Sequence, residues 1–424
     1  MKNLKLSLFT RSARVISMTY LGFLLFSTGS IYAKNYLTLP QGRSTFGYKY
    51  VVTDDITHKL DPNGKKESYS IREDVNSVQL EQVGNVFKSY FEILKSLSPE
   101  AYNAFSFGEY SVEASGNVKA QGIGMGHGFT HRLTGYFALP LYKAQSTVNL
   151  KQTKFSNIQA VKDALQGSTP NSTTEIFMKQ FTEQLPEASG EVLQSLVTNY
   201  YGYKPIGKWK KDSPGDMEVG FIYNLANEFS YGTALAFGTV LPTGSVDDPD
   251  NLQDIPSGDG QTDFFIENLS GMTLIEGRLD LDLRTRYTHQ VASEKYLRIP
   301  ENETFPLSAK KAYVQEKLGD KIEADLTFTA TYFEHFKNDL SLVYSKKFQD
   351  QYTLENATAK SYLEKNTDSD AVWVKTGLKF STIDLFKANK FWVPLDIGAS
   401  VQTLLTGRNT PDYTRIDLDF RLYF

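Results

Sequence analysis

Apolar and polar residues alternate along long stretches of this 424-residue chain, and this alternation limits its possible folds more than any other feature. A period of two predicts a β-strand with one apolar and one polar face. In residues 413–424 one face would carry Ile416, Leu418, Phe420, Leu422 and Phe424. The other face would carry Arg415, Asp417, Asp419, Arg421 and Tyr423. Such a strand lies between an apolar and a polar environment.

Similar alternation recurs about twelve times along the chain. The segments are residues 43–53, 109–124, 131–143, 216–225, 229–241, 261–272, 278–291, 321–333, 339–348, 370–382, 391–404 and 413–424. Most have roughly 10 to 14 residues, whereas strands of soluble proteins usually have five or six. About 9 to 11 tilted residues are enough to cross a membrane. Segment length therefore favours a membrane barrel over a soluble sandwich.

The connections between these segments alternate between long and short. The long ones are residues 54–108, 144–215, 242–260, 292–320 and 349–369, and the short ones lie near residues 128–130, 226–228, 275–277, 335–339 and 384–390. Outer-membrane barrels have this asymmetry, with short periplasmic turns and longer external loops. The connection at residues 406–412 departs from it, because it is short although it should be external. We predict an all-β fold, a transmembrane antiparallel β-barrel of about twelve strands.

The N-terminus has the parts of a secretory signal peptide. It has a basic beginning, an apolar stretch over residues 15–26 and a small residue, Ala33, after which we expect cleavage. We therefore predict a signal peptide over residues 1–33 and a single barrel domain over residues 34–424. The C-terminal Phe424 on an alternating strand is also typical of clients of the barrel-assembly machinery, which we expect as a partner.

Composition excludes several other classes of protein. The chain has no cysteine, so it can form neither a disulfide framework nor a thiolate metal site. No other apolar run is long enough for a spanning helix, which excludes a helical membrane bundle. A net charge of −4 offers no basic face for nucleic acid.

Helical periodicity interrupts the two longest external connections. Apolar residues recur at spacings of three and four near residues 76–98 and again within residues 155–200. We expect helical segments there. They could pack across the barrel mouth as a lid, or they could be inert decorations of the loops.

Three stretches resemble outer-membrane proteins of the phenol meta-degradation pathway family, which is distantly similar to the long-chain fatty-acid transporter barrels. They are residues 126–141 (GHGFTHRLTGYFALPL), the pair Gly215-Asp216 that opens a strand, and residues 241–260 (LPTGSVDDPDNLQDIPSGDG). This chain has His131 where that family more often has Asp. The resemblance implies a transporter of small hydrophobic or aromatic solutes.

Charged residues fill the polar faces of three predicted strands. Because unpaired charges facing lipid are costly, we expect these faces to line the lumen. The candidates are Arg278, Asp280, Asp282, Arg284, Arg286, Glu323, Asp325, Arg415, Asp417, Asp419 and Arg421. They could line a polar path for solutes, or they could form salt-bridged ladders between strands, which their mixed signs favour. Twelve strands predict a narrow passage, occluded by the helical loops or the N-terminal segment.

Signals for catalysis or metal binding are weak. His127 and His131 would lie about 13 Å apart on an extended chain, too far to share one ion. Ser293 follows His289 by four residues, but no motif makes this pair a hydrolase site. The acidic loop with Asp247, Asp248, Asp250, Asp254 and Asp259 could bind Ca²⁺ or Mg²⁺, or it could be a solvated loop. We predict no catalytic residue, no metal site, no cofactor and no enzymatic activity.

These features together predict an outer-membrane channel or transporter for small solutes. The alternative is a non-conducting barrel that displays its long external loops for adhesion or recognition. The expected partners are the solute, outer-membrane lipid and lipopolysaccharide.

Overall fold

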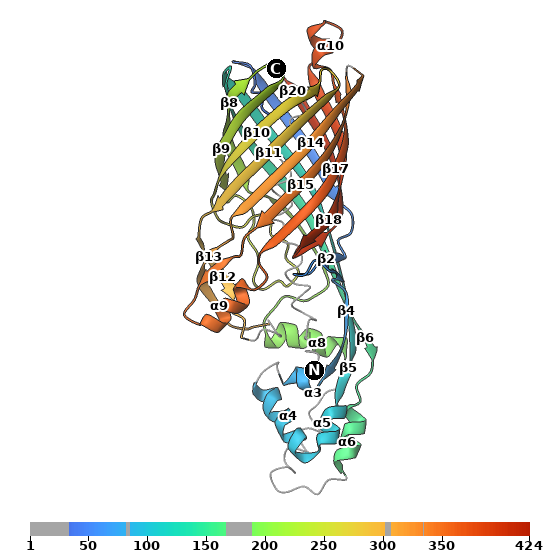
Figure 1. Cartoon of the computed structure of the whole chain (residues 1–424). Helices are drawn as coiled ribbons and strands as arrows, with labels where there is room; N and C mark the ends of the chain where they lie inside the picture. The colour runs from blue at the N-terminus through green and yellow to red at the C-terminus, as the bar shows by residue number, and fades with distance from the viewer. Residues whose placement is uncertain (1–33, 82–84, 167–188, 302–306, 334) are drawn as a thin grey trace.

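Twelve strands form a closed antiparallel barrel, which confirms the predicted fold class (Figure 1). The computed structural model describes residues 34–424 except 82–84, 167–188, 302–306 and 334, so the predicted signal peptide lies outside the described residues. The first strand, β1, pairs with the last, β20, and this pairing closes the barrel. The barrel strands are β1 (Ser44–Thr53), β5 (Ser106–Thr130), β6 (Leu133–Lys154), β8 (Met217–Asn227), β9 (Tyr231–Leu241), β10 (Asp263–Ile275), β11 (Leu279–Gln290), β14 (Lys321–Phe333), β15 (Phe336–Lys347), β17 (Ser369–Ser381), β18 (Leu395–Arg408) and β20 (Thr414–Tyr423).

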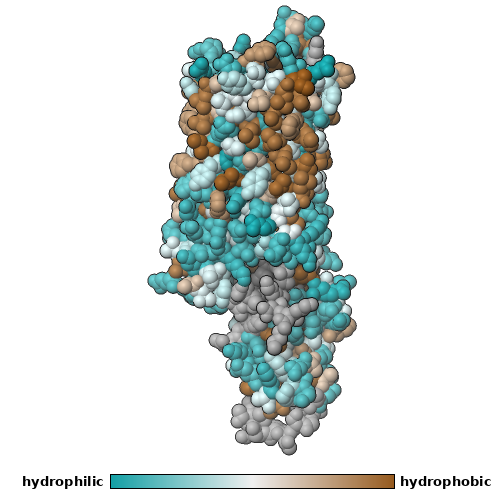
Figure 2. Space-filling view, viewed as in Figure 1, coloured by the Kyte–Doolittle hydropathy of each residue, from teal (hydrophilic) through white to brown (hydrophobic). Residues whose placement is uncertain are grey.

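The alternation in the sequence separates the outside of the barrel from its interior. On β20, the side chains of Ile416 and Leu418 are 46% and 47% exposed, whereas Arg415 and Asp417 are each 1% exposed. Figure 2 shows hydrophobic side chains gathered along the side of the barrel between two hydrophilic ends. An apolar outer band with polar ends is what a barrel needs to lie in the outer membrane.

The two ends of the barrel differ in the way the sequence predicts. Tight turns join β5 to β6, β8 to β9 and β10 to β11 at the end that carries the short helix α10 (Ile383–Lys387) (Figure 1). The long connections all leave the opposite end. By the rule for outer-membrane barrels, the end with the turns is periplasmic and the end with the loops is extracellular.

Strands β5 and β6 are 25 and 22 residues long, well beyond their predicted lengths. Both continue past the barrel on the extracellular side, where β4 (Ile71–Asn76) pairs with β5 and β7 (Lys208–Pro214) pairs with β6. Polar residues interrupt the sequence pattern here, because the extended ribbon no longer faces lipid.

Helical segments lie on this ribbon, but residues 167–188 of the second predicted segment lie outside the described residues. They are α3 (Ser77–Leu80), α4 (Asn85–Leu97), α5 (Pro99–Ala104), α6 (Ile158–Gln166), α8 (Gly190–Ser195) and the π-helical turn η1 (Leu196–Tyr200). Phe91, Leu94, Tyr102 and Ile158 pack with Phe107 of β5 in one apolar core. Helices α3 to α6 lie at the far end of the ribbon, beyond the barrel mouth (Figure 1). They therefore pack on the ribbon, and the predicted lid across the mouth is not formed by these helices.

Two small sheets complete the extracellular end. One contains β12 (Ser293–Arg298), β13 (Lys311–Lys317) and β16 (Gln351–Thr353), beside α9 (Ala357–Glu364). The other contains β2 (His58–Leu60), β3 (Lys66–Ser68) and β19 (Thr410–Asp412). None of the helices in the described ranges is both long and apolar enough to span a membrane.

Candidate functional site in the barrel lumen

Two arginines and three glutamates form a buried ion-pair network on one wall of the lumen. The Arg286 guanidinium lies 2.8 Å from Glu218 and 3.6 Å from Glu267, and it stacks over the Phe265 ring. The Arg284 guanidinium lies 2.9 Å from Glu267 and 3.8 Å from Glu323. Neighbouring strands β8, β10, β11 and β14 thus supply charges of opposite sign. Since a buried charge is costly unless it is paired, each charge of this network depends on its partners in the neighbouring strands.

A second network surrounds Asp417 on the opposite wall. The ammonium of Lys49 lies 3.2 Å from Asp417 and 3.6 Å from Asp419. Arg415 and Lys375 lie 3.0 Å and 3.7 Å from the same Asp417 carboxylate. Three cations therefore surround one buried anion, with Asp419 as a second, partly exposed counter-charge.

Most of the predicted lumen residues lie on inward faces, and one does not. Arg278 is exposed in the periplasmic turn before β11, so its placement in the lumen was wrong. The alternation of β11 starts one residue later than expected because residues 276–278 form the turn. The inward set is Asp280, Asp282, Arg284, Arg286, Glu323, Asp325, Arg415, Asp417, Asp419 and Arg421. Glu218, Glu267, Lys49 and Lys375 complete the networks but did not stand out in the sequence. Glu218 and Lys49 are single charges in their strands, and the charges of β10 and β17 are separated by several uncharged residues.

The N-terminal segment, residues 34–42, occupies part of the lumen. The Tyr36 ring is fully buried against Ala234, Ala236 and Leu269. A Cβ at Gly232 would lie 2.1 Å from the Tyr36 ring, so only glycine leaves room for it. No sequence pattern predicts the position of this segment, because a chain docked inside a barrel needs no alternation.

Hydrogen bonds fix the backbone of the same segment. The Asn35 N–H donates to the Asp282 carboxylate at 3.0 Å, and the Asn35 side chain donates to the backbone of Leu283. The side-chain amide of Asn224 donates to the carbonyl of Tyr36 at 2.9 Å. Nearer the periplasmic rim, the Leu39 N–H donates to the Thr134 hydroxyl at 2.8 Å. The segment is therefore held at several points along the β6 to β11 side of the barrel.

A polar cavity of about 70 Å³ remains beside the docked segment. Asn35 forms one side of it, and strands β10, β11, β14, β15, β17, β18, β20 and β1 form the rest. Among its lining residues are four aspartates, four cations and four hydroxyl-bearing residues: Asp282, Asp325, Asp339, Asp419, Lys49, Arg284, Lys375, Lys379, Thr327, Thr329, Ser341 and Ser400. The periplasmic half of the lumen is thus hydrophilic.

The extracellular half of the lumen is filled by an apolar and aromatic cluster. Its inward side chains include Val51, Val118, Tyr142, Trp373 and Tyr413, each at most 2% exposed. The Trp373 and Tyr413 rings lie 4.8 Å apart between centroids. A solute that crosses the barrel must displace or pass these rings.

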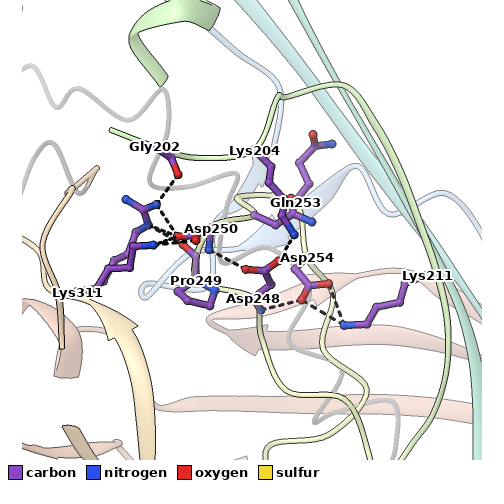
Figure 3. A network of polar contacts seen from close by, with 11 residues as sticks. Gly202, Lys204, Lys211, Asp248, Pro249, Asp250, Gln253, Asp254 and Lys311 are labelled. Atoms are coloured by element: carbon purple, nitrogen blue, oxygen red, sulfur yellow. Dashed lines mark hydrogen bonds and ion pairs between the residues drawn. The ribbon is translucent and has the colours of Figure 1, made fainter. Parts of the chain in front are cut away.

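The acidic loop, residues 242–260, folds inward at the extracellular mouth, and Ile255 joins the apolar cluster. Figure 3 shows its carboxylates turned toward basic side chains. Asp248 pairs with Lys204 at 2.5 Å, and Asp254 pairs with Lys211 at 3.3 Å. The loop is thus neither freely solvated nor arranged around a cation, and the described residues contain no group of three or more potential metal ligands.

Arg298 of β12 ties this loop to its neighbours. Its guanidinium lies 2.6 Å from Asp250, donates to the carbonyls of Tyr201 and Ser308, and stacks over the Tyr203 ring. Partial burial alone would raise the pKa of Asp250, but hydrogen bonds from Lys311 and Arg298 outweigh it and lower that pKa. We call this arrangement the Arg298 clasp; it joins three extracellular loops.

The candidate histidines His127 and His289 each contact a polar side chain. The His127 ring nitrogen lies 2.9 Å from the Ser44 hydroxyl, and the His289 ring nitrogen lies 3.2 Å from Asp320. His289 therefore pairs with the carboxylate of Asp320 and not with Ser293.

Comparison with known proteins supports the fold. No family model and no curated protein matches this chain. An outer-membrane channel of Pseudomonas putida F1 is similar in structure, with a TM-score of 0.50, 11% identity, and coverage of 92% of this chain and 98% of that one. The toluene transporter TodX of Pseudomonas putida aligns with a TM-score of 0.32, 12% identity, and coverage of 98% and 93%. At such identities the likeness concerns the fold alone, which is that of an outer-membrane β-barrel.

Proposed function

We propose that this protein is an outer-membrane channel or transporter for small solutes, and that the structure is its closed state. The observation that carries the proposal is which segments of the chain close the lumen. The N-terminal segment and the loop at residues 242–260 obstruct it, and both are connections that can move without unfolding the barrel. A barrel of this size is wider than an eight-stranded one, whose interior its own side chains fill.

The lining favours solutes that combine an aromatic ring with a polar group. The extracellular half offers aromatic contacts at Trp373 and Tyr413, and the periplasmic half offers charges and hydroxyls. A purely apolar solute would lose favourable contacts in the polar cavity, where it would displace water from charged groups. This preference agrees with the small aromatic solutes that the sequence resemblance implies.

Single-channel conductance of the reconstituted protein tests the proposal. The wild type should give small or rare currents, and variants lacking residues 35–42 or residues 246–256 should give larger ones. Shortening the periplasmic turn at residues 384–390 is the matched control, because this turn contributes to neither lumen obstruction. Absence of discrete current from every folded variant would overturn the channel proposal.

Blockage of the larger current tests the solute class. Benzoate should block at lower concentration than acetate, which has the same charge but no ring. Equal block by both anions would remove the aromatic part of the proposal while leaving the channel intact.

Surface display is the second candidate, and the ribbon of β4, β5 and β6 favours it. This ribbon holds a helical unit with its own apolar core away from the barrel mouth. A unit that neither closes the mouth nor lines the lumen is free to contact an external partner. Its removal should leave conductance unchanged if transport is the function of the barrel.

Export and assembly belong to the proposal as well. We propose that residues 1–33 are removed on export, so that the mature chain begins at Lys34. Phe424 directly follows the last strand and is 54% exposed, and we propose that it serves as the signal for the barrel-assembly machinery.

A further inference from the structure

Four exposed lysines form a basic patch on the outer surface of the barrel. They are Lys119 of β5, Lys143 of β6, and Lys208 and Lys210 of β7. Strand pairing makes them neighbours: Lys119 pairs with Lys143, while Lys210 and Lys208 pair with Gln145 and Thr147 of the same β6. The residues between them along β6 are buried, so these lysines share the outward face.

The patch begins where the apolar outer band ends. On β6, Lys143 follows the outward-facing Leu141 and Phe137, which are each 39% exposed. On β5, Lys119 lies on the same face as Met125, which is 43% exposed. The patch is on the extracellular side of this band, since the helical ribbon continues from it. It therefore lies at the level of the headgroups of the outer leaflet.

The charge of the patch is largely uncompensated. Its four lysines face one acidic residue at these pairing positions, Asp212, which gives a net charge of +3 (four minus one). The Lys143 ammonium lies 3.9 Å from Asp212, a loose contact between two exposed side chains. Among the residues that the structure describes, Lys119, Lys208 and Lys210 have no ion pair. Clustered lysines at a membrane surface attract anionic headgroups, and a lysine ammonium binds phosphate as a point charge.

We propose that this basic patch binds the phosphate groups of lipopolysaccharide in the outer leaflet. The lysines would contact the phosphorylated sugars while Leu141 and Phe137 contact the acyl chains below them. This inference concerns the outside of the barrel and does not depend on transport through the lumen.

Binding of purified lipid A to the full-length protein in detergent tests the inference. The probe is bisphosphorylated lipid A, compared with dephosphorylated lipid A and with inorganic phosphate. The variant K119Q/K143Q/K208Q/K210Q should lose on the order of 10-fold or more in affinity for the bisphosphorylated form. The matched control K65Q/K88Q/K387Q/K390Q makes the same change of charge at exposed lysines away from the patch, and it should bind within about 2-fold of wild type.

Three results would overturn the inference. One is an equal loss in both variants, which would indicate a general effect of net charge. Another is equal binding of phosphorylated and dephosphorylated lipid A. The third is full competition by inorganic phosphate at millimolar concentration, which would indicate a site for the free ion. Heat-modifiable mobility on gels checks that both variants are folded, and all substituted positions are exposed.

Discussion

Replacing Tyr36 with alanine should release the N-terminal segment from the lumen. The ring is fully buried among Ala234, Ala236 and Leu269. It also occupies the space where a side chain at Gly232 would lie. Removing a buried aromatic side chain costs about 3 to 5 kcal/mol. A cost of about 3 kcal/mol shifts the ratio of docked to released segment by roughly 100-fold.

Tyr36→Phe is the matched control for this change. The Tyr36 hydroxyl is buried and has no hydrogen-bond partner in the described part of the chain. Phenylalanine therefore keeps the ring contacts and removes a polar atom that lacks a partner, so the segment should stay docked.

Single-channel recording and cysteine labelling provide two independent readouts. Because the chain has no cysteine, a single Asn35→Cys substitution gives a specific label site in the segment. The alanine variant should show larger conductance and faster labelling of this cysteine than the phenylalanine variant. If both variants label and conduct alike, Tyr36 does not anchor the segment and the reasoning fails.

Four further changes test other parts of the structure. Arg286→Met leaves Glu218 without its cation and Glu267 with Arg284 alone, so the free energy of unfolding should fall by about 3 to 5 kcal/mol, seen as a lower urea concentration at the midpoint of unfolding in detergent. Arg298→Ala should open the Arg298 clasp and raise the mobility of a spin label at a cysteine placed at Val246, whereas unchanged mobility would count against the clasp. The pKa of Asp250 is lowered from its ordinary 3.8, so its pairing contributes fully above that value and is lost as pH falls through the lowered pKa. The same label should therefore be unaffected between about pH 8 and 5 and become mobile only below about pH 4. Asp282→Asn, added to the alanine variant, should reduce the cation preference of its current, because release of the segment exposes that carboxylate.

The barrel could be predicted from the sequence because lipid imposes a simple rule on it. Every residue on the outer face of a strand must suit the bilayer, so alternation repeats in each strand and fixes both their number and their direction. The rule applies only to the parts of the strands that face lipid. It therefore failed to predict the extracellular continuation of β5 and β6 and the exact start of β11, where Arg278 belongs to the turn.

The lumen was only partly predictable for a related reason. The charges of β11 and β20 stood out because several follow one another on a single face. Their partners, such as Glu218 and Lys49, are single charges on strands with mostly small or aromatic inward residues. Closure of the barrel brings partners on different strands together, and no local sequence pattern predicts these contacts. The position of Tyr36 depends on the same closure, since it contacts strands about 200 residues away.

The distribution of charge in the lumen explains why the N-terminal segment lies where it does. In the periplasmic half, the inward face of β9 carries Gly232, Ala234 and Ala236, which leave space and carry no charge. The opposite strands carry the lysines and aspartates that line the cavity. An aromatic anchor is stable against the small apolar side chains, whereas on the charged side it would separate ion pairs from water and from each other. The small side chains of β9 thus receive the ring and the charged side chains of the opposite strands line the cavity, and the two meet at Asp282, which accepts from Asn35 and also lines the cavity. Release of the segment would widen the passage along β9 while the ion-pair networks of the lumen stay intact.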